Sequence, residues 1–370
     1  MPRSDLRHLL TPAWNLLDCR SGLLAIAFIA ALLSMPSAQG QTQRPAAGQA
    51  AAADPIVGHA ISLRLDLSEP QRPAVYAGDQ LVAAYVDHSG NKPIIYPLQT
   101  VGGRQVIRDW PMVESQGGEG KRDHVHHRSM WFSYGDIDGV DYWAETAERQ
   151  GSIDTRTVTA TEADRSVTIE SRWDWKRPDG SKHLESNQSF TIQLDASTLL
   201  IDSDILLTAS EQDLRFGDTK EGAFAIRVAD AMAVDAKQGG AIVNADAAKD
   251  GDTWGQSSKF VQYTGPVAAV STSNPASAED HAAIAILVHP DTFGYPGRWH
   301  VRTYGLFAHN PFGVRDFAEA APVTDAEQDR QGGFTLKRGE SLRLKYRTLV
   351  SDRPLPTELI EKYWNEFADR

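Results

Sequence analysis

Three of the 11 histidines of this chain, His124, His126 and His127, fall within four consecutive positions, and Arg128 and Trp131 follow closely. Imidazole exchanges protons near neutral pH, so a cluster of this kind indicates a functional site rather than a solvated loop. We predict His124 and His126 as catalytic proton-transfer groups, and His127, Arg128 and Trp131 as substrate-binding residues. If the segment is a strand, His124 and His126 share one face and His127 lies on the other.

A second segment, residues 216–222 with the sequence FGDTKEG, places Lys220 next to Glu221 between two glycines. A carboxylate at such a position can act as a base, while the neighbouring ammonium group can stabilise a developing oxyanion. We predict Glu221 as a third catalytic residue and Lys220 as a substrate-binding residue. An ordinary charged turn is the alternative that the same residues allow.

A third segment, residues 296–313, has the sequence PGRWHVRTYGLFAHNPFG. In an extended conformation His300, Arg302 and Tyr304 share one face, and such a polar face is costly to bury without partners. Arg302 can hold a carboxylate or polarise a carbonyl group. We predict His300, Arg302 and Asn310, whose amide lies at a turn, as substrate-binding residues. A structural polar network is the alternative.

A metal site is another use of the same side chains. His124 and His126, together with His300 or Glu221, would supply three ligands for zinc or a similar ion. The HExxH helix of many zinc enzymes is absent, and no phosphate loop or dinucleotide fingerprint occurs. The only cysteine, Cys19, lies near the amino terminus. We therefore expect no cofactor, and a divalent metal is the alternative.

The segments that must position these residues have the sequence pattern of β-strands. Apolar residues alternate with polar ones at 61–67, and similar runs occur at 166–175, 188–194, 199–207, 224–228, 282–288 and 341–350. Short polar turns rich in glycine separate many of these runs. After Pro356 and Thr357, a candidate N-cap, apolar residues recur with helical spacing. The pattern predicts an all-β protein, a large antiparallel β-sandwich with one short C-terminal helix.

The amino terminus resembles an export signal. Arginines at positions 3, 7 and 20 precede the uncharged run Gly22–Met35, and small residues follow it. This order predicts a secretory signal peptide over residues 1–40, because the run is shorter than the roughly 20 residues of a membrane span. We expect a flexible linker at 41–54, a single β-sandwich domain at 55–370, and a periplasmic or secreted protein without stable membrane insertion after signal cleavage. An uncleaved anchor is the alternative.

The net charge of the chain limits the classes of partner that it can bind. Asp and Glu number 49 against 37 Lys and Arg, which gives a formal net charge of −12. An acidic protein without a basic stripe is a poor ligand for nucleic acids or anionic membranes, because these partners are anionic as well. We therefore expect no nucleic-acid partner.

Three motifs, DHVHHRSMWFSYGDIDGVDYWAE, GDTKEGAFAIRVADAM and GRWHVRTYGLFAHNPFG, resemble in sequence and order the bacterial domain family catalogued as "methane oxygenase PmoA". The resemblance extends from about residue 60 to about residue 350. It implies an exported protein of carbohydrate catabolism with a small carbohydrate as substrate, often encoded near sugar oxidoreductases, and with a galactose-mutarotase-like architecture. Methane oxidation is excluded, because that chemistry needs a redox metal in a polytopic membrane protein, and residues 41–370 contain no apolar span of sufficient length.

Two functions remain. In the first, histidine and Glu221 provide acid–base catalysis that cleaves a glycoside or a keto-glycoside by hydrolysis or β-elimination, or that epimerises or mutarotates a sugar. In the second, the protein binds a carbohydrate without changing it, and Trp131, Trp143 and Trp299 supply stacking surfaces. If the predicted catalytic and binding residues line one pocket, the enzyme hypothesis gains support.

Overall fold

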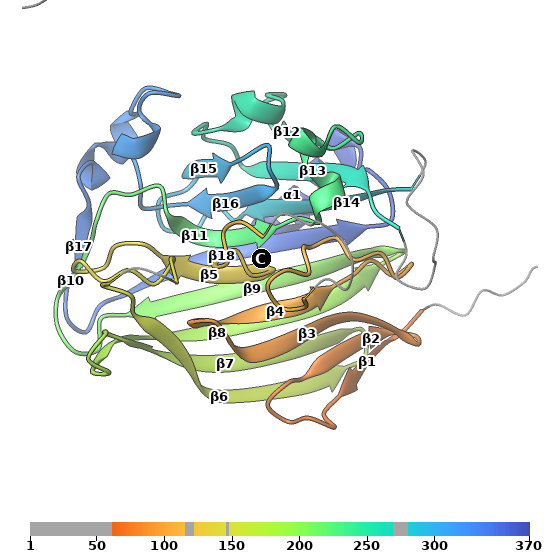
Figure 1. Ribbon diagram of the computed structural model, residues 1–370, viewed down its shortest axis with the longest axis horizontal. Coiled ribbons are helices and arrows are strands. Elements are labelled where there is room, and N and C mark those ends of the chain that lie inside the picture. Colours follow the sequence, from red (N-terminus) through yellow and green to blue (C-terminus); the bar gives the residue numbers. More distant parts are fainter. Residues whose placement is uncertain (1–60, 115–121, 146–147, 269–279) are drawn as a thin grey trace, which may run out of the picture. The chain divides into compact units, whose positions relative to one another are not determined.

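The computed structural model describes residues 61–114, 122–145, 148–268 and 280–370 (Figure 1). The predicted signal peptide at 1–40 and the predicted linker at 41–54 lie outside these described residues. So do residues 55–60, the start of the predicted domain. None of the helices in the described ranges has the length and apolar character that a membrane span requires.

Two eight-stranded sheets, antiparallel throughout, account for most of the described structure (Figure 1). The first sheet has, in spatial order, β1 (Leu63–Asp66), β2 (Ala74–Ala77), β3 (Gln80–Ser89), β4 (Lys92–Leu98), β5 (Met130–Tyr134), β11 (Gly222–Arg227), β16 (Leu306–Asn310) and β15 (Arg298–Val301). The second sheet has β12 (Ala241–Asn244), β13 (Phe260–Pro266), β14 (His281–Val288), β18 (Ser341–Ser351), β9 (Thr198–Thr208), β8 (Lys182–Asp195), β7 (Ser166–Lys176) and β6 (Ser152–Ala163). The predicted antiparallel β-sandwich is thus confirmed.

Shorter elements connect these strands. A small ribbon pairs β10 with β17, and five single-turn or two-turn 3₁₀ helices lie in the described connections. Their bounds are β10 (Leu214–Phe216), β17 (Phe334–Leu336), η1 (Asp230–Met232), η2 (Val234–Ala236), η3 (Asp250–Thr253), η4 (Arg315–Phe317) and η5 (Asp325–Arg330).

Alternation of apolar and polar side chains explains why the sheets pack face to face. In β7, Val167, Ile169 and Trp175 are buried between the sheets, whereas Glu170 and Arg172 point outward and are exposed. The runs predicted from 166 onward overlap β7, β8, β9, β11, β14 and β18, although the run at 188–194 covers only the second half of β8 and the run at 224–228 is displaced from β11. The predicted strand at 61–67 is wrong at its ends: β1 is shorter, and Ile61 and Leu67 are 49% and 46% exposed.

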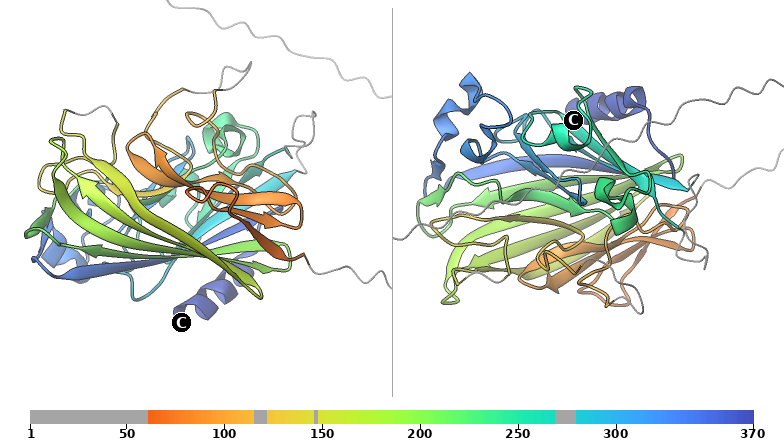
Figure 2. Two further views of the ribbon diagram at one scale, coloured as in Figure 1. Left: turned by 90° about the horizontal axis from the view of Figure 1, so that it is seen from below. Right: turned by 45° about the horizontal axis from the view of Figure 1, so that its top comes forward.

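The C-terminal helix α1 (Thr357–Ala368) packs against the second sheet on the side away from the first sheet (Figure 2, left). Its buried residues Ile360 and Tyr363 contact a cluster of side chains from that sheet. Arg347 of β18 is fully buried beneath the helix and donates to both carboxylate oxygens of Asp202, each at 2.6 Å, and to the carbonyl of Tyr363. The helix begins one residue earlier than predicted, because Pro356 and not Thr357 is its N-cap.

Truncating the helix face should destabilise the sandwich. We expect Ile360→Ala to lower the free energy of unfolding by about 2–5 kcal/mol, because it leaves a cavity between helix and sheet. The exposed Asn365 lies on the other face of the helix, and Asn365→Ala should change this free energy by less than about 0.5 kcal/mol. Urea denaturation of both variants measures the difference. Equal values would mean that the helix contributes little to stability.

Candidate functional site

A cavity of about 580 Å³ lies where several connections of the first sheet meet. These connections precede β5, follow β5, precede β11 and follow β15. The lining residues are His124, His126, His127, Asp141, Trp143, Ala144, Lys220, Glu221, His300, Arg302, Thr303 and Tyr304. Its volume is within the range of about 300–1,000 Å³ that small-molecule sites occupy.

The floor of the cavity follows from the strand register. Trp131 pairs with Ala225, Ala225 with Ala308, and Ala308 with His300, so these four side chains form one row across the outer face of the sheet. The two alanines leave a hollow between the larger residues at the ends of the row. The indole of Trp143 packs with this row, 5.1 Å from the Trp131 ring and 6.4 Å from the His300 ring. Trp143 therefore forms a buried apolar floor beneath the polar groups.

The histidine segment is a turn rather than a strand. His124 has a φ of 45°, and the amide of His127 donates to the carbonyl of His124 at 2.9 Å. The expectation that His127 would point away from His124 and His126 is therefore wrong, since all three rings line the cavity. The ring of His124 stacks on that of His127, with 4.7 Å between their centroids.

Asp123 orients the imidazole of His124. Its Oδ2 accepts from Nδ1 of His124 at 2.9 Å, which leaves Nε2 as the free nitrogen. Oδ1 of Asp123 accepts from the buried guanidinium groups of Arg108, at 2.7 Å, and Arg227, at 3.3 Å. Partial burial alone would raise the pKa of Asp123, but Arg227, His124 and Arg108 together lower it below its ordinary value. The carboxylate therefore stays ionised beside His124.

The other three histidines of the cavity are held neutral by burial. Desolvation lowers the pKa of His126 to about 4, with Lys92 and His124 acting in the same direction. Desolvation lowers the pKa of His300 to about 3, with Arg302 as the next cause. The pKa of His127 is also far below its ordinary value, because of burial and the adjacent His126 and Arg227.

Hydrogen bonds fix which ring nitrogens of two of these histidines carry a proton. Nδ1 of His300 lies 2.9 Å from the carbonyl oxygen of Lys220, which can only accept, so Nδ1 is protonated and Nε2 is an acceptor. Nδ1 of His127 lies 3.2 Å from the guanidinium of Arg227, which can only donate. The neutral His127 therefore carries its proton on Nε2. His127 and His300 therefore offer hydrogen-bond donors and acceptors at fixed positions while remaining uncharged.

Lys220 and Glu221 form an ion pair at the cavity wall, with Nζ and Oε1 3.0 Å apart and about one third of each side chain exposed. The segment before β11 is held by its backbone: the amide of Lys220 donates to Asp316, and the carbonyl of Glu221 accepts from Gly135. Asp218, from the same segment, accepts from the amides of Val314, Arg315 and Gly332, and its role is structural.

The structure places Arg302 in the same cavity, although not by the predicted route. Strand β15 ends at Val301, and Arg302 begins a turn that Gly305 closes by donating to its carbonyl. Even so, His300, Arg302 and Tyr304 all line the cavity, whereas Trp299 is fully buried on the other side of the sheet. Tyr304 stacks on His124, with 5.0 Å between the ring centroids.

Three predicted binding residues do not line the cavity. Arg128 forms a bidentate ion pair with Glu145, at 2.5 and 2.6 Å. Trp131 is 2% exposed and packs beneath Trp143. Asn310 accepts from the amides of Phe312 and Gly313 and donates to the carbonyl of Thr219, so it shapes the turn after β16.

Some residues that shape the site were not identified from the sequence. The adjacency of Asp123 to His124 was a usable signal, because neighbouring acid and imidazole groups often pair. Arg108 and Arg227 lie far from His124 in the chain, and Trp254, whose ring lies 3.6 Å from the guanidinium carbon of Arg302, gave no local signal.

Beneath the floor, Lys92 is completely buried and donates to the carbonyl of Trp143 and to Glu145, each at 3.2 Å. Burial lowers the pKa of Lys92 to about 8, although Glu145 opposes the shift. This ammonium group ties the Trp143 segment to β4.

The alternative metal site is not assembled in the described structure. Within the described ranges, no three His, Cys, Asp or Glu side chains are placed so that they could hold a metal ion together. His124 and His126 therefore do not combine with His300 or Glu221 into the three-ligand set considered from the sequence.

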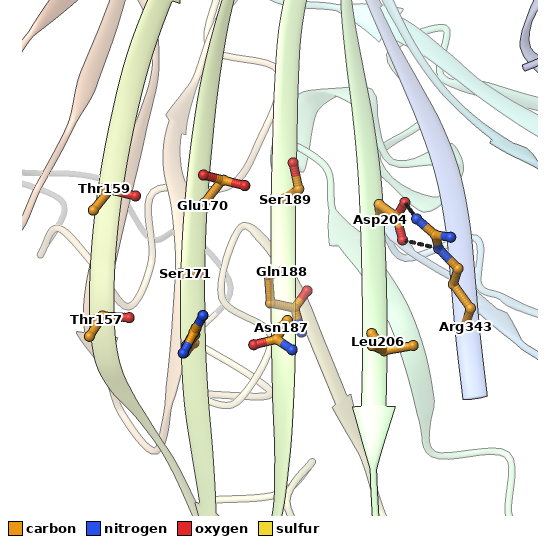
Figure 3. Close-up of a pocket in the computed structure, with 11 residues that line it drawn as sticks. Thr157, Thr159, Glu170, Ser171, Asn187, Gln188, Ser189, Asp204, Leu206 and Arg343 are labelled. Carbon is orange, nitrogen blue, oxygen red and sulfur yellow. Dashed lines mark hydrogen bonds and ion pairs between the residues drawn. The ribbon is translucent and has the colours of Figure 1, made fainter. Parts of the chain in front are cut away.

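A second hollow, of about 620 Å³, lies on the outer face of the second sheet (Figure 3). Strands β6 to β9 contribute side chains such as Thr157, Glu170 and Asn187, and Arg343 of β18 pairs with Asp204. No histidine is among its described lining residues, and its Arg343 and Asp204 satisfy each other. We therefore place the candidate active site in the histidine-lined cavity.

A family model described as "Family of unknown function (DUF6807)" matches residues 72–365. No curated protein matches the chain significantly. This match neither supports nor contradicts the resemblance to the family catalogued as methane oxygenase PmoA, which stays a prediction.

Three similar solved structures are distant in sequence and in structure. The galactosidase domain of the α-galactosidase–sucrose kinase AgaSK is 10% identical, with a TM-score of 0.41 over 79% of this chain and 42% of that one. The α-galactosidase AgaB from Geobacillus stearothermophilus is 11% identical, with a TM-score of 0.33 over 79% and 41%. A galactose mutarotase related enzyme from Lactobacillus acidophilus is 10% identical, with a TM-score of 0.24 over 77% and 97%. The chain spans less than half the length of the first two proteins.

The low pKa values of the buried histidines predict how their rings titrate in solution. We expect His126 and His300 not to titrate between pH 5 and 8, because burial keeps their pKa values at about 4 and about 3. Since these values lie below that of an unfolded histidine, about 6.5, their contribution to stability is complete above pH 6.5 and is lost as the pH falls towards 4 and then 3. Histidine NMR titrations measure this, with His126→Gln for assignment. A midpoint near 6.5 for either ring would contradict the buried arrangement.

Proposed function

Because the chain belongs to the family of unknown function DUF6807, whose name assigns no reaction, we propose a function from the site itself. We propose an exported carbohydrate-active enzyme that uses histidine–glutamate acid–base chemistry to cleave a glycoside or keto-glycoside. The observation that carries the proposal is the Asp123-oriented His124, which lines one cavity together with the Lys220–Glu221 pair and Arg302. Export rests on the predicted signal peptide.

His124 is the proposed mobile proton carrier. Its Nδ1 is held by Asp123, its side chain is 37% exposed, and its face is fixed by the Tyr304 ring. A general acid or base needs such access together with a fixed orientation. In contrast, His126 and His300 remain neutral and suit hydrogen bonding to sugar hydroxyl groups.

Glu221 is the proposed second proton carrier. It lines the same cavity as His124 and Tyr304, and Tyr304 stacks on His124. Two proton-transfer groups on one cavity wall fit a reaction that removes one proton and delivers another.

The proposed chemistry balances without a cofactor. In β-elimination, a base takes the proton next to a carbonyl group, the C–H electron pair forms a C=C bond, and the C–O bond to the leaving group breaks. The departing oxygen then receives a proton from the acid. In hydrolysis, the oxygen of a water molecule bonds to the anomeric carbon while the base takes a proton from the water, the C–O bond to the leaving group breaks, and the acid protonates the departing oxygen. A keto group acidifies the C–H bond, so imidazole and carboxylate bases suffice, and when Glu221 takes up the proton the charge of Lys220 is released from its ion pair and can stabilise the enolate.

Burial of two tryptophans argues against a simple binding module. That alternative needs aromatic surfaces for sugar rings, but Trp131 and Trp299 are 2% and 0% exposed and line no part of the cavity. Of the three tryptophans considered, only Trp143 lines the cavity, and it is itself only 1% exposed. The lining is instead dominated by ionisable groups, which favours catalysis over stacking.

An NMR time course on residues 41–370 with glycosides and their 3-keto derivatives tests the proposal. We expect the keto-glycosides to be cleaved, and His124→Gln and Glu221→Gln each to lower kcat by at least about 100-fold. Arg343→Gln is the matched control, because Arg343 lies on the other sheet and pairs with Asp204. Binding without turnover would instead support the carbohydrate-binding module, and interconversion of sugar isomers without cleavage would support an epimerase or mutarotase.

The variant Asp123→Asn tests whether the orientation of His124 by Asp123 contributes to catalysis. The variant retains a hydrogen-bonding side chain of the same size but removes the charge beside His124, so we expect kcat to fall by at least about tenfold. It also removes a counter-charge of the buried Arg108 and Arg227, so its stability should fall, and circular dichroism at the assay temperature shows whether it is folded. An unchanged kcat would show that His124 does not need this carboxylate.

A further inference from the structure

Arg302 is held firmly in the cavity wall. Its amide donates to the carbonyl of Leu306 at 2.8 Å, and its carbonyl accepts from Gly305 and from the hydroxyl of Tyr263. The guanidinium carbon lies 3.6 Å from the centroid of the Trp254 ring, within the range of a strong cation–π contact. The half-buried side chain is therefore positioned before any ligand arrives.

The charged groups around Arg302 already have partners. Glu221 pairs with Lys220, Asp123 pairs with Arg108, Arg227 and His124, and Oδ1 of Asp141 accepts from the amides of Trp143 and Ala144. Within the described part of the chain, the guanidinium of Arg302 has neither an ion pair nor a hydrogen-bond acceptor. A half-buried guanidinium with five N–H donors and no acceptor favours the binding of an anion.

We propose that Arg302 binds a carboxylate of the substrate, so that the sugar accepted by this cavity is a uronic acid or another sugar acid. The inference rests on the proposed function, because it places the substrate in the same cavity.

The geometry favours a carboxylate over a phosphate. A planar guanidinium matches the two oxygens of a carboxylate, and one fixed arginine is sufficient to bind it. A phosphate group carries more charge and commonly takes several cationic or amide donors. Here the nearby ammonium group of Lys220 is engaged by Glu221, whose own carboxylate would repel a dianion.

A carboxylate at Arg302 also serves the proposed chemistry. When a carboxylate sits beside the labile C–H bond of a sugar, its negative charge opposes loss of the proton. Ion pairing with Arg302 would offset that charge and stabilise the carbanion-like state as the proton passes to His124 or Glu221. The electron pair then forms the C=C bond while the leaving-group oxygen departs with a proton. Among the proposed reactions, β-elimination is therefore favoured.

Isothermal titration calorimetry with methyl β-glucuronoside, methyl β-glucoside and glucose 6-phosphate tests the inference. We expect the glucuronoside to bind at least about tenfold more tightly than the other two, and Arg302→Gln to abolish this preference. Arg302→Lys keeps the charge but lacks the planar fork, so it should retain only part of the preference. Arg343→Gln, remote from the cavity, should bind like the unaltered protein.

Equal affinity for glucuronoside and glucoside, a preference for glucose 6-phosphate, or a preference that survives Arg302→Gln would each overturn the inference. Thermal unfolding of each variant shows whether it is folded, and Arg302→Lys supplies the test if Arg302→Gln is not. A time course with a 4-linked uronide distinguishes the two proposals. Binding through Arg302 without cleavage would support the carboxylate site and refute the proposed enzyme. Cleavage of neutral keto-glycosides that does not depend on Arg302 would support the enzyme and refute the carboxylate site.

Discussion

The ion-pair cluster around Asp123 is the interaction on which the site depends. This carboxylate joins the histidine turn to Arg227 of β11 and to Arg108, which are 0% and 3% exposed. Without it, two buried guanidinium groups would lose a principal counter-charge, and breaking a buried pair in this way is strongly destabilising. The same carboxylate holds Nδ1 of His124, so the group that stabilises the loop also orients the proposed proton carrier.

The sandwich supports this cluster by separating packing from chemistry. Large apolar side chains such as Trp175 and Phe224 fill the space between the sheets. The outer face of the second sheet is partly covered by α1, and the outer face of the first carries the cavity. Because strand register is pinned by the buried face, the connections that carry the histidines, Lys220 and Arg302 leave the sheet at fixed points.

Much of the fold was predictable from the sequence because alternation survives in strands that are buried on one face. Strands β7, β9 and β18 were found in this way. The prediction failed at Ile61 and Leu67, because alternation by itself does not show where pairing with a neighbouring strand stops. The N-cap was displaced by one residue, since Pro356 adopts the capping conformation without any side-chain hydrogen bond.

The candidate site was predictable in composition but less so in geometry. Polar clusters in three segments marked His124, Lys220 and Arg302, which line one cavity. The positive φ of His124 turns the histidine segment back on itself, and the alternation rule does not apply to a turn. Arg128 and Asn310 have the same chemical character as binding residues, yet their partners Glu145 and Thr219 become visible only when distant segments meet.

The two alanines in the floor of the cavity set its depth. Ala225 and Ala308 leave room for the indole of Trp143 between Trp131 and His300, so the height of that ring above the sheet depends on two methyl groups. A larger side chain at either position would lift the indole towards the opening and make the cavity shallower, while the acid–base groups stayed on their own connections. The size of ligand that the cavity admits can therefore change through residues that are not part of its lining.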